Sequence, residues 1–248
     1  MKNIIKFEFD KLFRQKSFYV CTIIVLGLTL LSAVSTNVML SSELGAAIAK
    51  PDGWSYAASA VSNSQLLMIL GIFTAMFVCS EYDENTLKNI YSRGYGRIPV
   101  YIGKYISSFI AMTIMFAAST LVSFCTASAL WGTGNSDGYL RSIICQFVVL
   151  IGYHALFYVI SVILGKTGGA IAFNIVAPMI VSMLLSIADG LLNIDSFKFG
   201  NYWLDSFLAT AQNTAAETNQ IILCVVASLI YTIVLFIVGI TINKKKQL

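Results

Sequence analysis

His154 is the only histidine of the chain and the residue best suited to proton transfer, and it lies inside a long apolar run. A histidine within a membrane can relay protons or contact a polar substrate. The neighbouring apolar runs contain no acid with which it could exchange protons. We therefore expect His154, with Gln146 nearby, to be a hydrogen-bonded packing residue or a contact on a substrate pathway. An intramembrane enzyme that uses His154 is the alternative.

Gly165-Lys166-Thr167 matches only the end of a phosphate-binding loop. The full motif needs a glycine at position 160, where this chain has Ile160, and a preceding strand. We therefore expect a turn there and no ATPase site, so that the chain binds no nucleotide cofactor itself. The single histidine also excludes a His-Glu-x-x-His zinc site. The cysteines, which show no metal-ligand spacing, are Cys21, Cys79, Cys125, Cys145 and Cys224.

The elements that carry these residues are predicted by composition. Of the 248 residues, 57% are hydrophobic and 11% are charged, and the mean hydropathy is +0.78. Globular proteins carry about 25% charged residues. This composition excludes a soluble enzyme, a nucleic-acid-binding protein and a disordered linker, and it indicates an integral membrane protein.

Six apolar blocks have the length that a bilayer core of about 30 Å requires of a helix. None contains an acid, lysine or arginine away from its ends. A charge at the centre of a span would cost about 2.5–3.5 kcal/mol. The runs are continuous rather than alternating, which favours helices over a barrel. The predicted fold is all-α, one domain of residues 1–248 with six transmembrane helices at Phe18–Val38, Leu66–Cys79, Tyr101–Ala129, Ile143–Leu164, Ala170–Ala188 and Ile221–Ile242.

The distribution of cations predicts the orientation. With both termini in the cytoplasm, thirteen of the sixteen lysines and arginines lie inside, and only Lys50, Arg141 and Lys198 lie outside. Cytoplasmic loops of membrane proteins carry this excess of positive charge. The formal net charge of +4 is therefore a bias toward one membrane face rather than a nucleic-acid patch.

Residues 1–17 are predicted to form an amphipathic helix in the membrane surface, because Ile5, Phe9, Leu12 and Phe13 share one helical face. A short charged tail is the alternative. At the other membrane face, residues 189–219 form a long outer loop rich in apolar residues, for which we expect short helices. In the fifth span, Asn174 and Pro178 could permit a bend or a close helix contact, and they join His154 and Gln146 as candidates for a substrate pathway.

The cytoplasmic segment 80–98 between the second and third spans is predicted to form a short helix. Ser80 with Asp83 resembles a capping box, acids follow at the expected helix start, and Gly94 suits a helix end. Such a helix could transmit force from a cytoplasmic partner to the spans. A solvated, positively charged loop is the alternative. By resemblance to a known family, the residues expected to couple to such a partner are Glu81, Asp83, Glu84, Thr86, Leu87, Lys88, Ser92, Arg93, Arg97 and Lys104.

Several of these residues resemble the pattern of ABC type 2 exporter permeases. In that pattern an acid ends the second span, a Thr-Leu segment and a basic residue follow, and a lysine opens the third span, as do Glu81, Thr86-Leu87, Lys88 and Lys104 here. The six spans, the N-terminal amphipathic helix and the long outer loop are also similar. Small permeases of lantibiotic-immunity and bacitracin-type resistance transporters have about this size.

The resemblance implies a permease in the bacterial plasma membrane without an ATPase site of its own. It implies two copies of a separate ABC ATPase subunit, which bind ATP and Mg²⁺, and a second permease that is identical or a sister subunit. The low charge of the spans suits a lipid-like, hydrophobic or peptide cargo, and an antimicrobial peptide is the expectation by resemblance. A non-transporting membrane anchor or peptide-binding protein is a further alternative.

Overall fold

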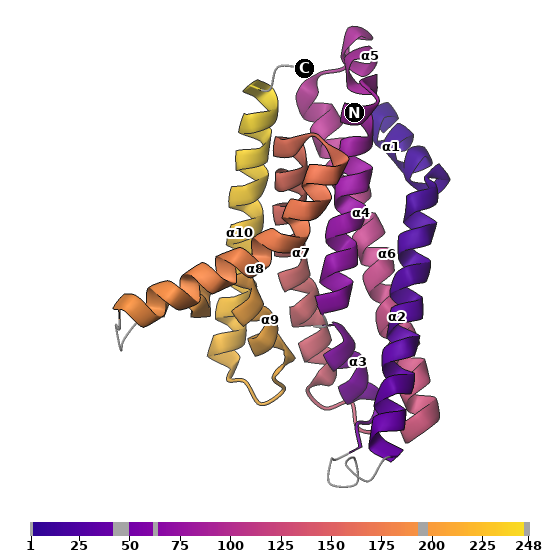
Figure 1. Ribbon diagram of the computed structural model, residues 1–248, viewed down its shortest axis with the longest axis vertical. Coiled ribbons are helices and arrows are strands. Elements are labelled where there is room, and N and C mark those ends of the chain that lie inside the picture. Colours follow the sequence, from indigo (N-terminus) through magenta and orange to yellow (C-terminus); the bar gives the residue numbers. More distant parts are fainter. Residues whose placement is uncertain (1, 42–49, 62–63, 193–197, 246–248) are drawn as a thin grey trace.

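The computed structural model describes residues 2–41, 50–61, 64–192 and 198–245. In this part of the chain the regular elements are all helical (Figure 1). In chain order they are α1 (Lys2–Arg14), α2 (Lys16–Ser41), α3 (Gly53–Val61), α4 (Ser64–Asp83), α5 (Thr86–Ser92), α6 (Arg97–Trp131), α7 (Tyr139–Leu164), α8 (Thr167–Leu192), the 3₁₀ helix η2 (Phe199–Tyr202), α9 (Leu204–Gln212) and α10 (Thr218–Lys245).

Six of these helices, α2, α4, α6, α7, α8 and α10, are long and apolar enough to cross a membrane. They coincide with the six predicted spans, which confirms the all-α polytopic fold. The predicted boundaries were too narrow; α4, for example, extends four residues beyond Cys79 to Asp83. The bundle has two ends, which we call the α5 end and the α3 end; the described residues nearest both termini lie at the α5 end (Figure 1).

Helix α7 forms the centre of the bundle. It packs against α4, α8, α9 and α10, and its buried side chains include Tyr153, Phe157 and Tyr158. The Tyr158 hydroxyl donates a hydrogen bond of 2.8 Å to the carbonyl of Tyr101 in α6. Aromatic rings therefore fill the space between α6, α7 and α10, where Tyr101, Tyr105 and Phe236 pack edge to face or tilted.

Helix α6 runs the full height of the bundle in 35 residues. It contacts α1 at the α5 end and α3 at the α3 end, with α2 alongside (Figure 1). Pro99 lies in its first turn, where the missing amide hydrogen is no loss, and Gly132 at φ 93° ends it. No proline interrupts the helix between these points.

Helix α8 starts in the bundle and then leaves it at a steep angle (Figure 1). Ala170 and Asn174 are buried, whereas large apolar side chains further along, such as Met179, Met183 and Leu191, are exposed. Pro178 lies inside this helix. The exposed side chains need lipid or another protein to cover them, as expected for a membrane helix that crosses at the edge of a subunit.

The segment after α8 turns back toward the bundle. Asp189 accepts hydrogen bonds from the amides of Phe199 and Gly200, at 2.6 and 2.8 Å, and thereby holds η2 against the end of α8. Helix α9 then packs on α7 and α10. Short helices thus occur between residues 189 and 219, but α9 lies against the bundle rather than flat on its outer surface. Residues 193–197 of this predicted loop lie outside the described residues.

Candidate functional site

Helix α5 stands at one extremity of the bundle, between two left-handed turns (Figure 1). Asn85 has φ 54°, a conformation that short polar side chains tolerate, and Gly94 has φ 86°. The predicted helix start was wrong. Ser80 and Asp83 belong to the last turn of α4, so they cannot form a capping box for the next helix, which begins at Thr86. The residues from Ser80 to Asp83 resemble a helix start, but they continue α4 past the end of its apolar run at Cys79.

The two faces of α5 differ in their environment. Leu87 is buried against Ile4 of α1 and Val100 of α6, with Ile90 and Tyr91 beside them. The other predicted residues of the segment, Glu84, Lys88, Ser92 and Arg93, are exposed. Helix α5 is therefore anchored to the bundle by Leu87, with Ile90 and Tyr91 packed beside it, and presents a polar, charged face outward.

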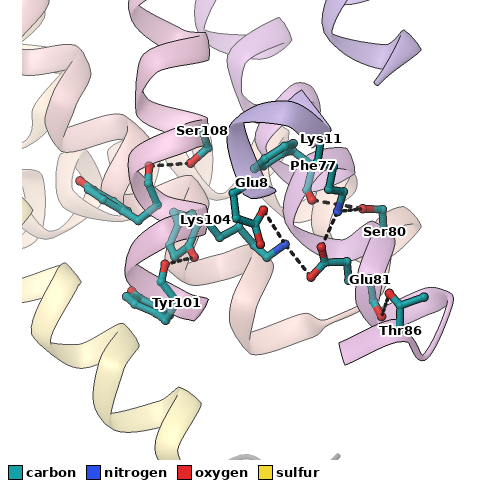
Figure 2. A network of polar contacts seen from close by, with 11 residues as sticks. Glu8, Lys11, Phe77, Ser80, Glu81, Thr86, Tyr101, Lys104 and Ser108 are labelled. Carbon is teal, nitrogen blue, oxygen red and sulfur yellow. Dashed lines mark hydrogen bonds and ion pairs between the residues drawn. The ribbon is translucent and has the colours of Figure 1, made fainter. Parts of the chain in front are cut away.

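Beneath α5, four charged side chains from three helices meet in a buried cluster (Figure 2). Glu81 at the end of α4 pairs with Lys104 of α6 through Oε2 and with Lys11 of α1 through Oε1, both at 2.7 Å. Lys104 Nζ also lies 3.4 Å from Glu8 Oε2 of α1. We call these residues, Glu8, Lys11, Glu81 and Lys104, the charge cluster. It joins α1, α4 and α6 at the point where α5 departs.

Three of the four residues of the charge cluster are almost inaccessible to solvent, whereas the Lys11 side chain is exposed by 22%. Glu8, Glu81 and Lys104 are exposed by 1%, 4% and 3%. Burial raises the pKa of the Glu8 carboxyl above its ordinary value, although the Lys104 ammonium acts against this shift. Burial, with the nearby charge of Lys104, lowers the pKa of Lys11. The two acids and two bases balance in formal charge, which is the condition under which such burial is tolerated.

Two members of the charge cluster, Glu8 and Lys11, were missed in the sequence. The buried face of α1 consists of Ile4, Glu8 and Leu12, whereas the predicted apolar face included Phe13, which is exposed. The helix itself was predicted correctly. The signal for Glu8 was its position between Ile4 and Leu12 at four-residue spacing, an acid in the middle of an otherwise apolar stripe.

The remaining predicted residues of the segment tie neighbouring helices together. Asp83 Oδ2 accepts hydrogen bonds from the backbone amide and the hydroxyl of Thr167 at the start of α8. The Thr86 hydroxyl donates to the Glu81 carbonyl at 3.4 Å. Arg97 donates to the Lys244 carbonyl at the end of α10, at 3.0 Å, and lies over the ring of Tyr91. The α4–α6 connection therefore contacts α8 and α10 as well as the charge cluster.

The predicted pathway residues fall into two separate places. Gln146 is buried and donates to the Ala58 carbonyl and the Ser142 hydroxyl. His154 Nε2 lies 2.9 Å from the Ser108 hydroxyl, and its ring packs against Tyr105. In the described chain no acid hydrogen-bonds to His154, so its contact with Ser108 is not a catalytic triad.

Asn174 and Pro178, in contrast, both line one cavity beside α4, α7 and α9. The Asn174 amide nitrogen donates to the Gly71 carbonyl at 2.9 Å and to the Ser161 hydroxyl at 3.2 Å, which joins α8 to α4 and α7. The structure thus brings together this pair, and it separates them from Gln146 and His154, which lie in the packed interior.

These features define a multi-pass helical membrane protein that displays a short helix at one end of its bundle. The model of the ABC-2 family transporter proteins matches residues 4–189, which is 186 of the 248 residues. The chain belongs to this family. It is accordingly the membrane subunit of an ABC transporter, which implies a separate ABC ATPase subunit, and in bacteria its place is the plasma membrane. No curated protein matches the sequence.

Proposed function

We propose that the chain is the permease of an ATP-driven exporter and that α5 is the coupling helix that docks on the ATPase. The observation that carries this proposal is the position of α5 directly above the charge cluster. A partner that displaces α5 also displaces the end of α4, because only Glu84 and Asn85 separate the two helices. Through Glu81, that displacement reaches α1 and α6.

A groove between α1 and α5 supports docking at this place. Phe7 of α1, Ile90 of α5 and Arg93, the residue directly after α5, line it, so an apolar floor adjoins an exposed cation. Phe7 is exposed by 53% although it is large and apolar. Exposed apolar side chains rimmed by charges are typical of protein interaction sites. Glu84, which precedes α5, and Lys88 and Ser92 on its outer face extend the polar rim.

The α5 end is assigned to the cytoplasm on charge. The α4–α6 and α7–α8 connections and the two ends of the chain carry thirteen of the sixteen lysines and arginines. Positive residues accumulate on the cytoplasmic side. ATP is available on that side only, which agrees with a coupling role for α5. ATP and Mg²⁺ would bind to the ATPase and not to this chain.

The working complex would contain two ATPase subunits and two permeases, the second permease being a copy of this chain or a sister subunit. ATP binding that closes the ATPase pair shifts the permease only if it has different affinities for the two bundle arrangements. The cargo is an amphipathic or hydrophobic molecule taken from the membrane, and an antimicrobial peptide of the lantibiotic type, with immunity or resistance as the result, is the favoured cargo. The cavity beside Asn174 and Pro178 supports an amphipathic cargo, because it opens between membrane-spanning helices.

Charge reversal on the exposed face of α5 tests this proposal. The permease is co-expressed with its partner ABC ATPase, and the amount of ATPase that copurifies is measured. Arg93→Glu should lower that amount about tenfold, because a desolvated charge contact at an interface is lost and replaced by repulsion. Lys166→Glu is the matched control, since Lys166 is an exposed cation at the same end but outside α5; it should change the amount less than about twofold. Equal effects of both variants would refute docking at α5.

Orientation is tested separately by labelling. Tyr95, exposed at the α5 end, is replaced by cysteine in a Cys125→Ser background, since Cys125 is the exposed native cysteine. A membrane-impermeant maleimide should react with this variant only after the cells are opened. Labelling of intact cells would place α5 outside and remove the coupling role.

A further inference from the structure

A cavity of about 240 Å³ opens between α4, α7, α8 and α9. Its walls are mostly apolar, and polar groups of Gln65, Tyr153, Asn174 and Asp205 reach it. The apolar lining residues are Leu67, Met68, Phe157, Ile175, Pro178 and Met179. Small-molecule sites usually have such a lining, with a small number of precisely placed polar groups in a mostly apolar cavity.

Asp205 enters this cavity because α9 folds back into the bundle. Leu204, the first residue of α9, packs against Gly152 of α7, where an added methyl group would lie 3.0 Å from its side chain. The adjacent Tyr153 is the fifteenth of the 26 residues of α7, and its hydroxyl donates a hydrogen bond to Asp205 Oδ1. An acid from a loop in the sequence therefore lies at the level of the middle of a membrane-spanning helix.

This carboxylate, which is partly buried, differs from the two acids of the charge cluster. Glu8 and Glu81 are each paired with lysine, whereas among the described residues no lysine, arginine or histidine forms an ion pair with Asp205. An unpaired charge at membrane depth is expensive, and such residues mark substrate or ion pathways. The Tyr153 hydrogen bond supplies one partner and leaves the charge itself uncompensated.

We propose that this cavity binds the positively charged head of an amphipathic cation, with Asp205 as the residue that selects for charge. The inference rests on the proposed export of an amphipathic cargo and names its class. Tyr153 is a positioning residue that holds the Asp205 carboxylate toward the cavity. Phe157, Ile175 and Leu67 contact the first part of the hydrocarbon.

The size of the cavity limits what enters it. Drug-sized ligands occupy about 300–1,000 Å³, so 240 Å³ holds the head and the first carbons of an amphiphile and not a whole peptide. Met179 and Met68, exposed by 69% and 46%, lie at the mouth. Their flexible side chains suit a variable apolar tail that continues into the lipid.

Asp205 lies beyond residues 4–189, which the family model matches. The proposed selectivity therefore depends on a part of the chain that the family model does not match. A purely structural role is the competing explanation, in which the Tyr153–Asp205 hydrogen bond only fastens α9 to α7. Asp205→Asn separates the two explanations, because the amide oxygen still accepts the hydrogen bond but carries no charge.

The test measures saturable binding of two probes to the full-length chain in nanodiscs of phosphatidylcholine. One probe is tritiated decyltrimethylammonium. The other is its neutral isostere, in which a tert-butyl group replaces the trimethylammonium head. The wild-type chain should bind the cation about tenfold more tightly than the isostere, the ratio expected for one partly buried charge contact. Asp205→Asn should remove this ratio and leave the affinity for the isostere unchanged within about twofold.

Glu217→Gln is the matched control, since Glu217 is an exposed acid of the same segment that does not line the cavity, and it should retain the tenfold ratio. Tyr153→Phe should lower the cation's affinity more than that of the isostere. Failure of the wild-type chain to prefer the cation, or an unchanged ratio in Asp205→Asn, overturns the proposal. An equal loss for both probes also overturns it, because that result indicates a structural role. The assay uses no ATPase, so its failure is distinct from a failure of docking at α5.

Discussion

Removal of the Glu81 charge should destabilise the protein more than removal of any exposed charge at the same end of the bundle. Glu81 bonds to Lys11 and Lys104 at 2.7 Å, so Glu81→Gln leaves two ammonium groups facing only Glu8. Lys104→Met leaves the Glu8 carboxylate without its partner at 3.4 Å. The double substitution leaves one acid and one base, Glu8 and Lys11, and restores the balance of charge.

The magnitude follows from the distances. At 2.7 Å and an effective dielectric constant of about 20, the attraction between Glu81 and Lys104 is about 6 kcal/mol before desolvation is subtracted. Breaking a buried pair by removing one partner costs about 3–5 kcal/mol, and we expect this loss for each single variant. Because the double variant is neutral again, its loss should be smaller than the sum of the two by about 2–3 kcal/mol.

The assay is equilibrium unfolding in mixed micelles, followed as SDS replaces a mild detergent, for the wild type, both single variants and the double variant. Glu84→Gln and Lys88→Met, which change exposed residues of the same connection, form the control cycle. They should cost less than about 1 kcal/mol each and show no coupling. Additive losses in the Glu81–Lys104 cycle, or single losses as small as those of the control, would show that the charge cluster does not join α1, α4 and α6 energetically.

Three further predictions concern single contacts. Asp83→Ala removes the acceptor for the Thr167 amide and should lower the free energy of unfolding by about 1 kcal/mol in the same SDS titration. Gly239→Ala should destabilise by about 1–3 kcal/mol, because its methyl group would collide with the Tyr101 hydroxyl, and Tyr101→Phe should recover part of that loss. His154→Phe should leave ATPase copurification and cargo export intact, because the ring packs in an aromatic cluster; lost export with normal ATPase binding would revive a chemical role for His154.

The spans could be predicted from the sequence because a helix that crosses the bilayer needs an apolar run of a certain length. Such runs can be recognised from local composition alone. The ends of the spans could not be predicted, since polar residues continue a helix wherever tertiary contacts hold them. Ser80 to Asp83 illustrate the difficulty. They have the composition of a helix start, yet Lys11 contacts Ser80 and Glu81 and keeps them within the last turn of α4.

Two of the four residues of the charge cluster were predicted from the sequence. Glu81 and Lys104 were selected by their resemblance to a family pattern, whereas their partners on α1 are some 70 to 96 positions away. The position of Asp205, which belongs to the predicted outer loop 189–219, was missed for a similar reason. The spacing of Leu204, Phe207, Leu208 and Ala211, all buried, is that of a helix with one apolar face, but only the fold places that face against the middle of α7.

Helix α6 has a mechanical consequence. Its 35 residues span about 52 Å, some 20 Å more than the hydrocarbon core, and it bears Lys104 near one tip and contacts α3 near the other. A rigid helix of this length that tilts by about 10° about its end near Lys104 displaces its opposite tip by about 9 Å. Under the proposed docking at α5, a small tilt imposed at that end therefore gives a larger displacement at the α3 end, because no proline interrupts the helix between Pro99 and Gly132.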